Sequence, residues 1–423
     1  MKQRYDSYKS SDIDWIGEIP SHWELLRMRF LCDMITGDKD TVNKVDDGNY
    51  PFYVRSPQIE RINSYSFDGE AVLMAGDGVG AGKVVHYANG KFDFHQRVYN
   101  FHNFKDIKGI LLYYYLKTLF KYKIEEGGAK NTVDSVRQPW LKDFPICVPP
   151  LAEQEAIAAW LDEKCGEIDA AIAKVDRELE LIDELKQSEI SRVVTRGLNP
   201  DAPLRSSGID WIGDVPEHWT KSRIKHHICR SAAGVWGEDE KGNEDDVICF
   251  RIADFNYGER RLDFDKITLR NIDAKQLEGR LLSKGDLLIE KSGGGDATPV
   301  GRVVYCNYSG KATYTNFIHS ITLKKEVDSR FFLFYFNMLY SNKINLLFFN
   351  QTTGLQNLQV GDYLAQSLYL PPLSEQQAIA DYLDKKCVEI DELKEKLVKK
   401  RETLKELRQA IISEVVTGKR KVI

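Results

Sequence analysis

Two stretches of this chain show the hydrophobic spacing of a coiled-coil seam. They begin directly after Pro149-Pro150 and Pro371-Pro372, and each runs for about 40 residues. Apolar residues recur there at steps of three, four and seven between charged residues, which is typical of helices that pack lengthwise. The seam residues we assign are Ile168, Ile172, Val175, Leu179, Ile182, Ile390, Leu397, Leu404 and Ile411. Because neither helix would be stable alone in water, we expect them to pack together as an antiparallel coiled coil.

The regions before each of these helices have a different pattern. Short β-rich runs such as 71–74 and 286–289 alternate with Gly-rich turns, and aromatic helical stretches follow at 110–120 and 331–349. The same order of elements occurs in both halves of the chain. The sequence therefore predicts an α+β protein with two homologous mixed α/β domains.

The two halves also share sequence motifs. The segment Ile13–Trp23 returns at Ile209–Trp219, 196 residues later, whereas Pro149-Pro150 returns 222 residues later. The stretch between the motifs is thus 26 residues longer in the second copy, and most of the added length precedes residue 301. Repeats of this kind indicate a fixed frame around a variable insert.

We divide the chain into four parts on this basis. They are a first recognition domain at 1–148, a central helix at 149–197, a second recognition domain at 198–370 and a C-terminal helix at 371–423. Gly197 and Gly418 stand at the positions of helix C-caps. Ser206-Ser207 matches Ser10-Ser11, so the first residues resemble the connector between the halves, and we expect the two ends of the chain to lie close together.

Composition limits the cellular setting more than the function. The formal net charge is −5, but residues 1–150 are balanced, with 20 basic and 20 acidic side chains, and the acidity is concentrated in 151–200. Charge therefore neither demonstrates nor excludes DNA contact. Seven scattered cysteines without metal-ligand spacing indicate reduced thiols. With no signal peptide or membrane-spanning run in the sequence, we expect a cytoplasmic protein without a membrane role.

Several polar and Gly-rich loops are candidates for DNA contact. Gly-rich turns can press their backbone against phosphates, and Gln, Asn and Arg can form bidentate contacts with base edges. The candidates are Gly78, Lys83, Gln96, Arg97, Lys130 and Asn131 in the first insert, and Ser292, Gly294, Arg302, Asn316, Gln351 and Thr352 in the second. Each has a simpler alternative as a tight turn, a structural hydrogen bond at a strand edge, or a solvent loop.

The repeated tryptophans have two alternatives as well. Trp15, Trp23, Trp211 and Trp219 could stack on bases, but they belong to the frame and not to the variable insert. This position favours packing or docking of a partner subunit. We find no Walker motif, no methyltransferase motif for amino groups, no HExxH and no hydrolase elbow, so we expect no catalysis and no metal site in this chain.

The frame motifs resemble a known family. Ile-Asp-Trp-Ile-Gly-Glu-Ile-Pro-Ser-His-Trp at 13–23 and Pro-Pro-Leu-Ala-Glu-Gln-Glu-Ala-Ile-Ala at 149–158, each with a second copy, are similar to those of the specificity subunit of type I restriction-modification enzymes. The resemblance covers essentially the whole chain. It implies a non-catalytic subunit that reads a bipartite, asymmetric DNA site, with one half-site per insert.

The resemblance also implies the partners. They are double-stranded DNA, two modification subunits that methylate adenine, and restriction subunits. S-adenosylmethionine, ATP and magnesium would be bound by those partners and not by this chain. A pseudo-two-fold arrangement would present the two readers in opposite senses along a duplex, with the helices setting the spacer between half-sites.

Alternative functions remain open at this stage. One is a self-sufficient DNA-modifying enzyme with an undetected active site, and another is a coiled-coil scaffold without a DNA role. A closer alternative is the specificity subunit of a related restriction system. The bases recognised and the spacer length are not contained in these motifs.

Overall fold

The computed structural model describes residues 3–126, 135–295, 297–352 and 354–422. The chain forms two compact units, and each takes part of both long helices. Unit 1 comprises Met1–Arg177 and Val398–Ile423, and unit 2 comprises Glu178–Leu397. No helix among the described residues is long and apolar enough to cross a bilayer.

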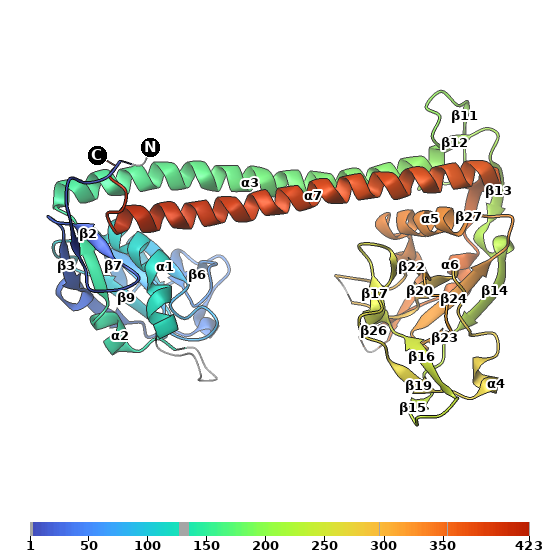
Figure 1. The fold of residues 1–423 in the computed structure, drawn as a ribbon, viewed down its shortest axis with the longest axis horizontal. Coiled ribbons are helices and arrows are strands. Elements are labelled where there is room, and N and C mark those ends of the chain that lie inside the picture. The colour runs from blue at the N-terminus through green and yellow to red at the C-terminus, as the bar shows by residue number, and fades with distance from the viewer. Residues whose placement is uncertain (1–2, 127–134, 296, 353, 423) are drawn as a thin grey trace. The chain divides into compact units, whose positions relative to one another are not determined.

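Unit 1 is built on a six-stranded sheet with one helix packed against it (Figure 1). The order across the sheet is β4 (Asp33–Thr36), β9 (Val98–His102), β7 (Phe67–Ala75), β8 (Val85–Phe94), β5 (Tyr50–Tyr53) and β6 (Glu60–Ile62). Neighbouring strands are antiparallel except for β5 and β8, which run parallel. Helix α1 (Gly109–Glu126) contacts β7 and β8.

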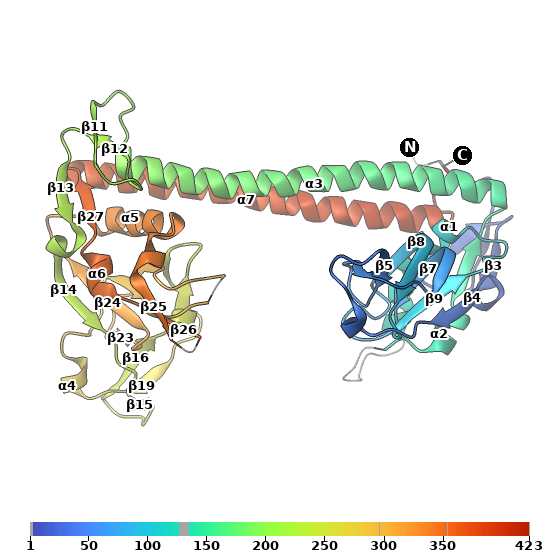
Figure 2. The ribbon, with the colours of Figure 1, turned by 180° about the vertical axis from the view of Figure 1, so that it is seen from behind.

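Unit 2 has a six-stranded sheet of its own, in which the neighbouring strands at 228–233 and 318–323 are labelled β14 and β24 in Figure 2. Its strands are β14 (Ile228–Ala233), β24 (Ile318–Leu323), β20 (Leu287–Glu290), β22 (Val303–Tyr305), β18 (Arg261–Leu262) and β17 (Phe255–Asn256). The first four correspond to β4, β9, β7 and β8, and helix α5 (Ser329–Ser341) contacts β22 as α1 contacts β8. This agreement confirms the predicted α+β fold of two homologous domains.

Unit 2 also has a second, four-stranded sheet. Its order is β15 (Glu238–Asp239), β19 (Leu269–Asn271), β16 (Asp246–Phe250) and β23 (Ala312–Tyr314), and helix α4 (Ala274–Leu277) follows β19. Strands β16 and β23 pair in parallel, as β5 and β8 do in unit 1. A parallel pair of this kind is therefore common to both units.

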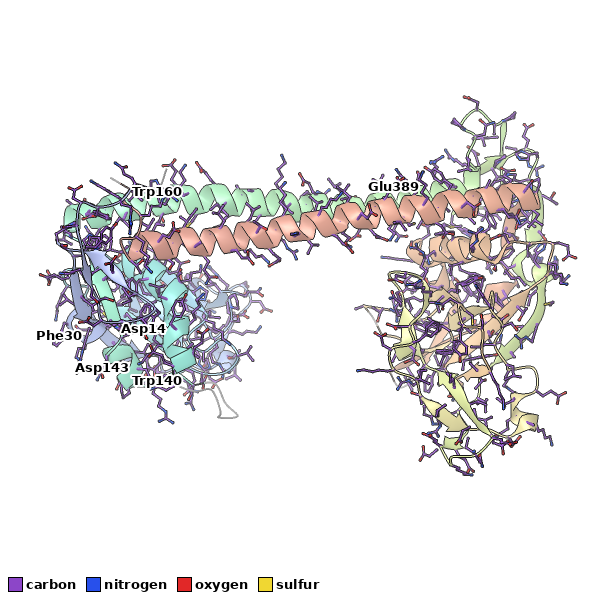
Figure 3. The ribbon with its side chains drawn as sticks, viewed as in Figure 1. Asp14, Phe30, Trp140, Asp143, Trp160 and Glu389 are labelled. Atoms are coloured by element: carbon purple, nitrogen blue, oxygen red, sulfur yellow. The ribbon has the colours of Figure 1, made fainter. Side chains whose placement is uncertain are left out.

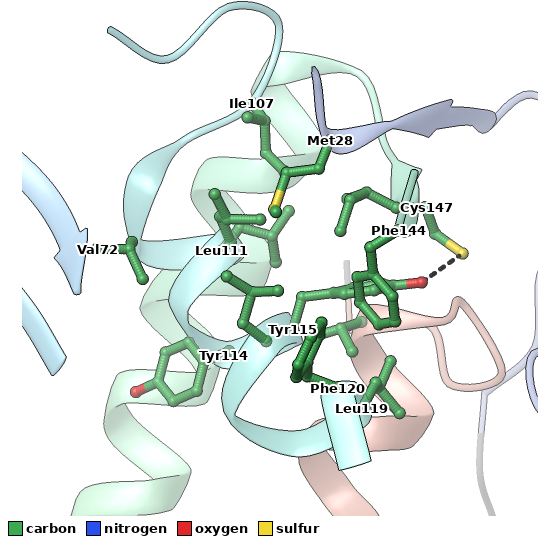
Figure 4. Packing of buried hydrophobic residues seen from close by; sticks show 14 of the residues in the cluster. Met28, Val72, Ile107, Leu111, Tyr114, Tyr115, Leu119, Phe120, Phe144 and Cys147 are labelled. Carbon is green, nitrogen blue, oxygen red and sulfur yellow. Dashed lines mark hydrogen bonds between the residues drawn. The ribbon is translucent and has the colours of Figure 1, made fainter. Parts of the chain in front are cut away.

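The aromatic helices predicted from the sequence form the centre of each core. In unit 1, Tyr115 and Phe120 of α1 are fully buried against Phe144 (Figure 4). The Tyr115 hydroxyl lies 3.5 Å from the Cys147 sulfur, which gives this buried polar group a partner. Removing such a ring costs about 3–5 kcal/mol because the cavity does not close fully. Helix α5 supplies the equivalent rings in unit 2, at Phe331, Phe332, Phe334, Tyr335 and Phe336.

The repeated frame motifs form matching two-stranded ribbons. Strand β1 (Tyr8–Ser10) pairs with β2 (Glu18–Pro20), and β11 (Leu204–Ser206) pairs with β12 (Asp214–Pro216) in the same register. Likewise β3 (Glu24–Arg27) pairs with β10 (Pro145–Val148), and β13 (Thr220–Arg223) with β27 (Ser367–Leu370). The Lys421 amide donates to the Gln3 carbonyl at 2.9 Å, so the two ends of the chain lie together as expected.

Short elements complete the two units. The helices are α2 (Gln138–Lys142) and α6 (Val360–Leu364), and the strands are β21 (Ser292–Gly293), β25 (Phe349–Thr352) and β26 (Leu355–Leu358). Short 3-10 helices occupy Met28–Phe30, Thr41–Asn43, Ile224–His227, Ile252–Asp254 and Ile344–Phe348.

The long helices α3 (Leu151–Arg196) and α7 (Leu373–Val416) pair antiparallel within each unit. All nine predicted seam residues are buried or half-buried. In unit 1, Asp169 pairs with Arg408 at 2.8 Å and Asp176 with Arg401 at 3.3 Å. In unit 2, Asp183 pairs with Lys394 and Lys186 with Asp391, both at 2.6 Å. The residue numbers of the partners add up to 577 in every pair, so one register holds in both units.

Both helices end at a glycine in the left-handed conformation. Gly197 has φ +72° and Gly418 has φ +71°, and the amide of each donates to a carbonyl of the last helical turn. A side chain at Gly418 would also collide with the Pro20 ring, since its Cβ would lie 2.2 Å from Cδ. The sequence expectation of glycine C-caps is confirmed.

Candidate nucleic-acid interface

Each unit has an exposed turn that leads into the equivalent strand of its six-stranded sheet, β9 in unit 1 and β24 in unit 2. In unit 1 it joins β8 to β9, and in unit 2 it joins β23 to β24. Residues 91–100 and 311–320 have the same order of buried and exposed positions, and the exposed pair at the tip is Gln96-Arg97 in one and Asn316-Phe317 in the other. The two turns are structurally equivalent but carry different side chains.

The backbone of both turns is held in the same way. The His95 amide donates to the Tyr53 carbonyl at 3.0 Å, and the Thr315 amide donates to the Phe250 carbonyl at 2.9 Å. Gly37, directly after β4, passes close to the end of β8. A Cβ at this position would lie 2.0 Å from the Phe94 carbonyl oxygen, so glycine is needed there. Each tip therefore projects from a rigid base, as a recognition element requires.

In unit 1 the arginine at the tip belongs to an ionic cluster. Arg97 Nε lies 3.5 Å from one carboxylate oxygen of Asp77, and Arg55 Nη1 lies 3.1 Å from the other. Arg97 remains 63% exposed. Two guanidinium groups share one carboxylate, so the cluster keeps a positive charge that suits a phosphate or a base acceptor.

The glutamine at the tip has an aspartate of its own. Gln96 Nε2 donates to Asp40 Oδ2 at 2.7 Å, and Asp40 Oδ1 accepts from the Thr41 amide at 2.6 Å. The bond from the Thr41 amide, assisted by Gln96 and His95, lowers the pKa of Asp40. The carboxylate therefore stays ionised at neutral pH and accepts from the amide of Gln96.

The side chain of His95 holds the backbone of this turn. Its Nδ1 accepts from the Arg97 amide at 2.9 Å, which requires Nδ1 to be unprotonated. Burial, with a contribution from Arg55, lowers the pKa of His95. The neutral imidazole thus holds the turn at physiological pH.

The Gly-rich loop of unit 1 lies beside this turn, because the Gly76 amide donates to the Arg97 carbonyl at 2.7 Å. Gly78 has φ +73°, and Val79 at the loop tip is 91% exposed. Lys83, just before β8, is also exposed. The predicted Gly78, Gln96 and Arg97 are thus brought together, whereas Lys130 and Asn131 lie outside the described residues.

The predicted residues of unit 2 are more dispersed. Arg302 is 22% exposed, donates to both carboxylate oxygens of Glu290 and lies with its guanidinium 3.7 Å from the centre of the Tyr257 ring. Ser292 donates to the Asn357 side chain at 2.7 Å. Arg302 and Ser292 thus have partners within unit 2, whereas Asn316 stands at the exposed tip. The contact of these residues with DNA stays a prediction.

The remaining candidates of unit 2 lie in or directly beside a small sheet formed by β21, β26 and β25. Gly294 has φ +64°, and a Cβ there would lie 2.8 Å from the Val300 amide nitrogen. Gln351 and Thr352 belong to β25, but their side chains lie outside the described part of the structure. Their proposed contact with DNA stays a prediction.

The four frame tryptophans divide into two pairs. Trp23 and Trp219 are 0% and 1% exposed, so both lie in the core. Trp15 is half-buried between Tyr122 and Phe144, and Trp211 is half-buried against Tyr335. Core packing accounts for the first pair, while the second pair retains surface for a partner. Trp15 also lines a pocket of about 370 Å³ that includes Leu25, Lys123 and Asp143.

Three residues of the unit 1 cluster were missed by the sequence reasoning. Asp40, Asp77 and Arg55 come from three separate segments that meet only in the folded domain. Asp77 stood inside the Gly-rich motif and could have been noted as an acceptor for a cation. Asp40 and Arg55 carried no comparable signal, because their partners are distant in sequence.

The described residues contain no group of three His, Cys, Asp or Glu side chains that could hold a metal ion. The acidic residues Asp143 and Glu389 (Figure 3) pair instead with cations: Asp143 with Arg27 and Arg29, and Glu389 with Lys386.

Comparison with known families matches one model to this chain twice. The type I restriction modification DNA specificity domain matches residues 20–178 and 216–400. Each match contains one of the two homologous sheets and extends into one of the long helices. The family model thus covers well over half of the chain.

Curated relatives agree with this match. The type I restriction enzyme EcoDI specificity subunit of Escherichia coli is 30% identical over 175 residues, which cover 41% of this chain and 38% of that protein. The putative type I restriction enzyme MjaX specificity subunit of Methanocaldococcus jannaschii is 24% identical over 449 residues, covering 99% and 97%. The MjaVIII specificity subunit of the same organism is 24% identical, covering 96% and 94%.

Solved structures share the fold. A chain from a structural study of complex assembly and conformational transition in the type I R-M system superposes with a TM-score of 0.69 at 15% identity, covering 94% of this chain and 98% of that one. The HsdS subunit from Thermoanaerobacter tengcongensis superposes with a TM-score of 0.51 at 16% identity, covering 95% and 98%.

Proposed function

This chain belongs to the family of type I restriction-modification DNA specificity subunits, and from that premise we propose that it reads a bipartite, asymmetric DNA sequence. Unit 1 would read one half-site and unit 2 the other. As a specificity subunit it is the non-catalytic member of a type I system. Methyl transfer and cleavage belong to its partners.

One observation carries this proposal. The two units hold equivalent rigid turns whose buried positions correspond, while their exposed tips differ as Gln96-Arg97 and Asn316-Phe317. A common scaffold with different polar and apolar tips is what two readers of different sequences need. Base contacts from these tips would supply specificity, and backbone contacts from the adjoining Gly-rich loop would set the register.

The proposal includes the partners and their cofactors. Two modification subunits that methylate adenine would dock on the repeated frame, because identical subunits need two equivalent surfaces. Trp15 and Trp211, which are half-buried and repeated, are candidates for that contact. Restriction subunits would complete the assembly in the cytoplasm. S-adenosylmethionine, ATP and magnesium would then be bound by those subunits.

The helices would set the distance between half-sites. The uninterrupted α3 and α7 have 46 and 44 residues and are locked in one register by four ion pairs. A stiff pair of this kind suits a spacer of fixed length. The pseudo-two-fold arrangement expected from the repeats would give the two half-sites opposite orientations.

An exchange of inserts tests this function. Residues 25–148 are replaced by the insert of another family member, and the variant is expressed with its modification partner. Methylation mapping should show a new first half-site with the second half-site and the spacer unchanged. The matched control replaces residues 221–370 and should change the other half-site only. A change in both half-sites from either exchange would refute the modular reading.

A further inference from the structure

The tip of the unit 1 turn carries a more specific inference, which rests on the proposed function. We propose that Arg97 reads a guanine and Gln96 an adenine in the first half-site. Asp77 and Asp40 act as positioning residues that orient these two side chains. The turn would thus recognise two purine bases. Arg97 would contact the O6 and N7 acceptors of a guanine, and Gln96 the N7 acceptor and N6–H donor of an adenine.

The geometry of Arg97 leaves the correct edge free. The Asp77 carboxylate approaches Arg97 at Nε, at 3.5 Å, so we take the pair of Nη1 and Nη2 as the edge that reads the base. No hydrogen-bond acceptor for that edge occurs among the residues that the structure describes. Two parallel N–H groups match the O6 and N7 acceptors of guanine in the major groove. Lysine offers no such fork.

Asp77 is itself well fixed. Its backbone forms a bridge with Ser135, and its second carboxylate oxygen lies 3.1 Å from Arg55 Nη1. The side chain is 21% exposed, less than either arginine. A carboxylate held on both sides can restrict the rotamers of Arg97 and so reduce the entropy lost when DNA binds.

The geometry of Gln96 fixes the orientation of its amide. Asp40 accepts from Nε2 at 2.7 Å, and a carboxylate can only accept, so the nitrogen must face it. The second N–H and the oxygen Oε1 then face away as a donor beside an acceptor. This pair matches N7 and N6–H of adenine.

The backbone of both reading residues is also clamped. The Gln96 amide donates to the Lys39 carbonyl at 2.8 Å, and the Arg97 amide donates to His95 Nδ1 at 2.9 Å. The Arg97 carbonyl accepts from the Gly76 amide at 2.7 Å. Fixed backbone and fixed side chains together distinguish this turn from a solvent loop.

Unit 2 provides the contrast within the same molecule. Its equivalent tip has Asn316 in place of Gln96 and Phe317, 41% exposed, in place of Arg97. A phenyl ring has no fork for guanine, so the second turn cannot make the same contact. The inference therefore applies to the first half-site alone.

The test uses the complex of the full chain with its modification partner. Methylation mapping first identifies the site, and binding is then measured on duplexes that carry each single base-pair change in the first half-site. Arg97→Lys should reduce discrimination at one G·C pair by roughly 5- to 150-fold, the range of a good bidentate contact. Gln96→Ala should do the same at one A·T pair. Binding to non-specific DNA should change little in both.

The positioning residues need their own readout. Asp77→Asn should relax preference at the pair that Arg97→Lys affects, and Asp40→Asn at the pair that Gln96→Ala affects, while non-specific binding does not fall. Asp68→Asn removes the same charge from an exposed site of unit 1 and should leave every preference unchanged. Equal weakening at all positions by Asp77→Asn would show a purely structural role and overturn the positioning.

Failure of this inference can be separated from failure of the proposed function. A first half-site made only of A·T pairs overturns the guanine contact. So does unchanged preference in the Arg97→Lys complex. In both cases the exchange of residues 25–148 still changes the first half-site if the proposed function holds. If that exchange changes nothing, the proposed function fails first.

Discussion

Individual residues of the repeated frame make contacts that explain why they recur. Gln154 is fully buried at the start of α3. Its Oε1 accepts from the Lys108 amide at 2.7 Å, and its Nε2 donates to the Asp106 and Pro149 carbonyls at 2.8 Å. Gln376 does the same at the start of α7, toward Asp328 and Pro371. One glutamine thus joins each long helix to its domain.

The first prediction concerns this junction. Gln154→Leu leaves the buried Pro149 carbonyl and the part-buried Lys108 amide and Asp106 carbonyl without this partner, and each costs up to about 1–3 kcal/mol. We expect the free energy of unfolding of unit 1 to fall by roughly 2–5 kcal/mol, measured by denaturant titration. Gln377→Leu, at an exposed position of α7, is the control and should change it by less than about 0.5 kcal/mol. Equal effects of the two substitutions would contradict the prediction.

The second prediction concerns pH. His319 lies in β24 with its Nε2 2.7 Å from the Ser231 hydroxyl, and burial, assisted by Lys291, lowers its pKa to about 4. The unfolded chain, with a histidine pKa of about 6.5, binds this proton more readily than the folded chain. Stability from neutral His319 is therefore present above about pH 6.5 and lost as pH falls toward 4.

The change should be visible by NMR and by unfolding. The His319 imidazole should titrate near 4 in the full chain, and the free energy of unfolding should decline between pH 6.5 and 4 by at most about 1.4 kcal/mol per pH unit from this group. His319→Gln should flatten that part of the profile. Titration of His319 near 6.5 would show that burial does not disfavour its charged form.

At this scale the sequence predicted some residues and could not predict others. Gln96, Arg97 and Asn316 were predicted as DNA contacts because their residue types suit base edges and their positions correspond between the halves. The structure places all three at exposed tips, and their contact with DNA stays a prediction. Asp40 and Asp77 were missed because a positioning contact depends on loops that meet only in three dimensions. Arg302 was predicted from its type alone, and its ion pair with buried Glu290 was not foreseeable.

At the scale of elements, the helices were predictable and the sheets were not. A seam that repeats every seven residues indicates two packed helices without further information. Strand order cannot be read in this way, because β4 pairs with β9 across more than 60 residues and β5 joins β8 in parallel. The short strands of unit 2, such as β17 and β18, carry no periodic signal.

The third prediction tests the helix register. Lys186 is 12% exposed and pairs with both carboxylate oxygens of Asp391. In this pair the cation belongs to α3, whereas in the neighbouring Asp183–Lys394 pair the cation belongs to α7. Asp391→Lys should destabilise unit 2 by placing two cations together. The double substitution Lys186→Asp with Asp391→Lys should recover about 0.5–1 kcal/mol of that loss.

The measurement is a double-mutant cycle by denaturant unfolding. Lys385→Asp, at an exposed position of α7, changes the charge without breaking a pair between the helices and serves as the control. Full additivity of the two single substitutions would show that the Lys186–Asp391 pair does not contribute to the register.

At the scale of the whole molecule, one chain combines a repeated frame with two different inserts. The frame ribbons have the same registers in both units, whereas the second insert contains an additional sheet pairing, between β15, β19 and β16. Partners that need identical surfaces would use the frame, and DNA halves that differ would be read by the inserts. On the proposed function, the helices would set the distance between the half-sites.

The fourth prediction follows from the helix register. Seven residues are inserted in α3 between 177 and 178, and seven in α7 between 397 and 398. Both insertions lie between the same two ion pairs, Asp176–Arg401 and Asp183–Lys394, so the seam and the pairs continue in phase. The helices lengthen by about 10 Å, which corresponds to about three base pairs.

Methylation mapping with the modification partner should therefore show both half-sites unchanged and a spacer about three base pairs longer. Insertion in α3 alone lengthens one helix while α7 keeps its length, so the two seams stay in register on one side of the insertion only. This variant should lose stable pairing of the helices. A longer spacer from the double insertion would show that the length of the helices, and not that of flexible connectors, determines the distance between the half-sites. An unchanged spacer would mean that the domains find their half-sites independently of helix length.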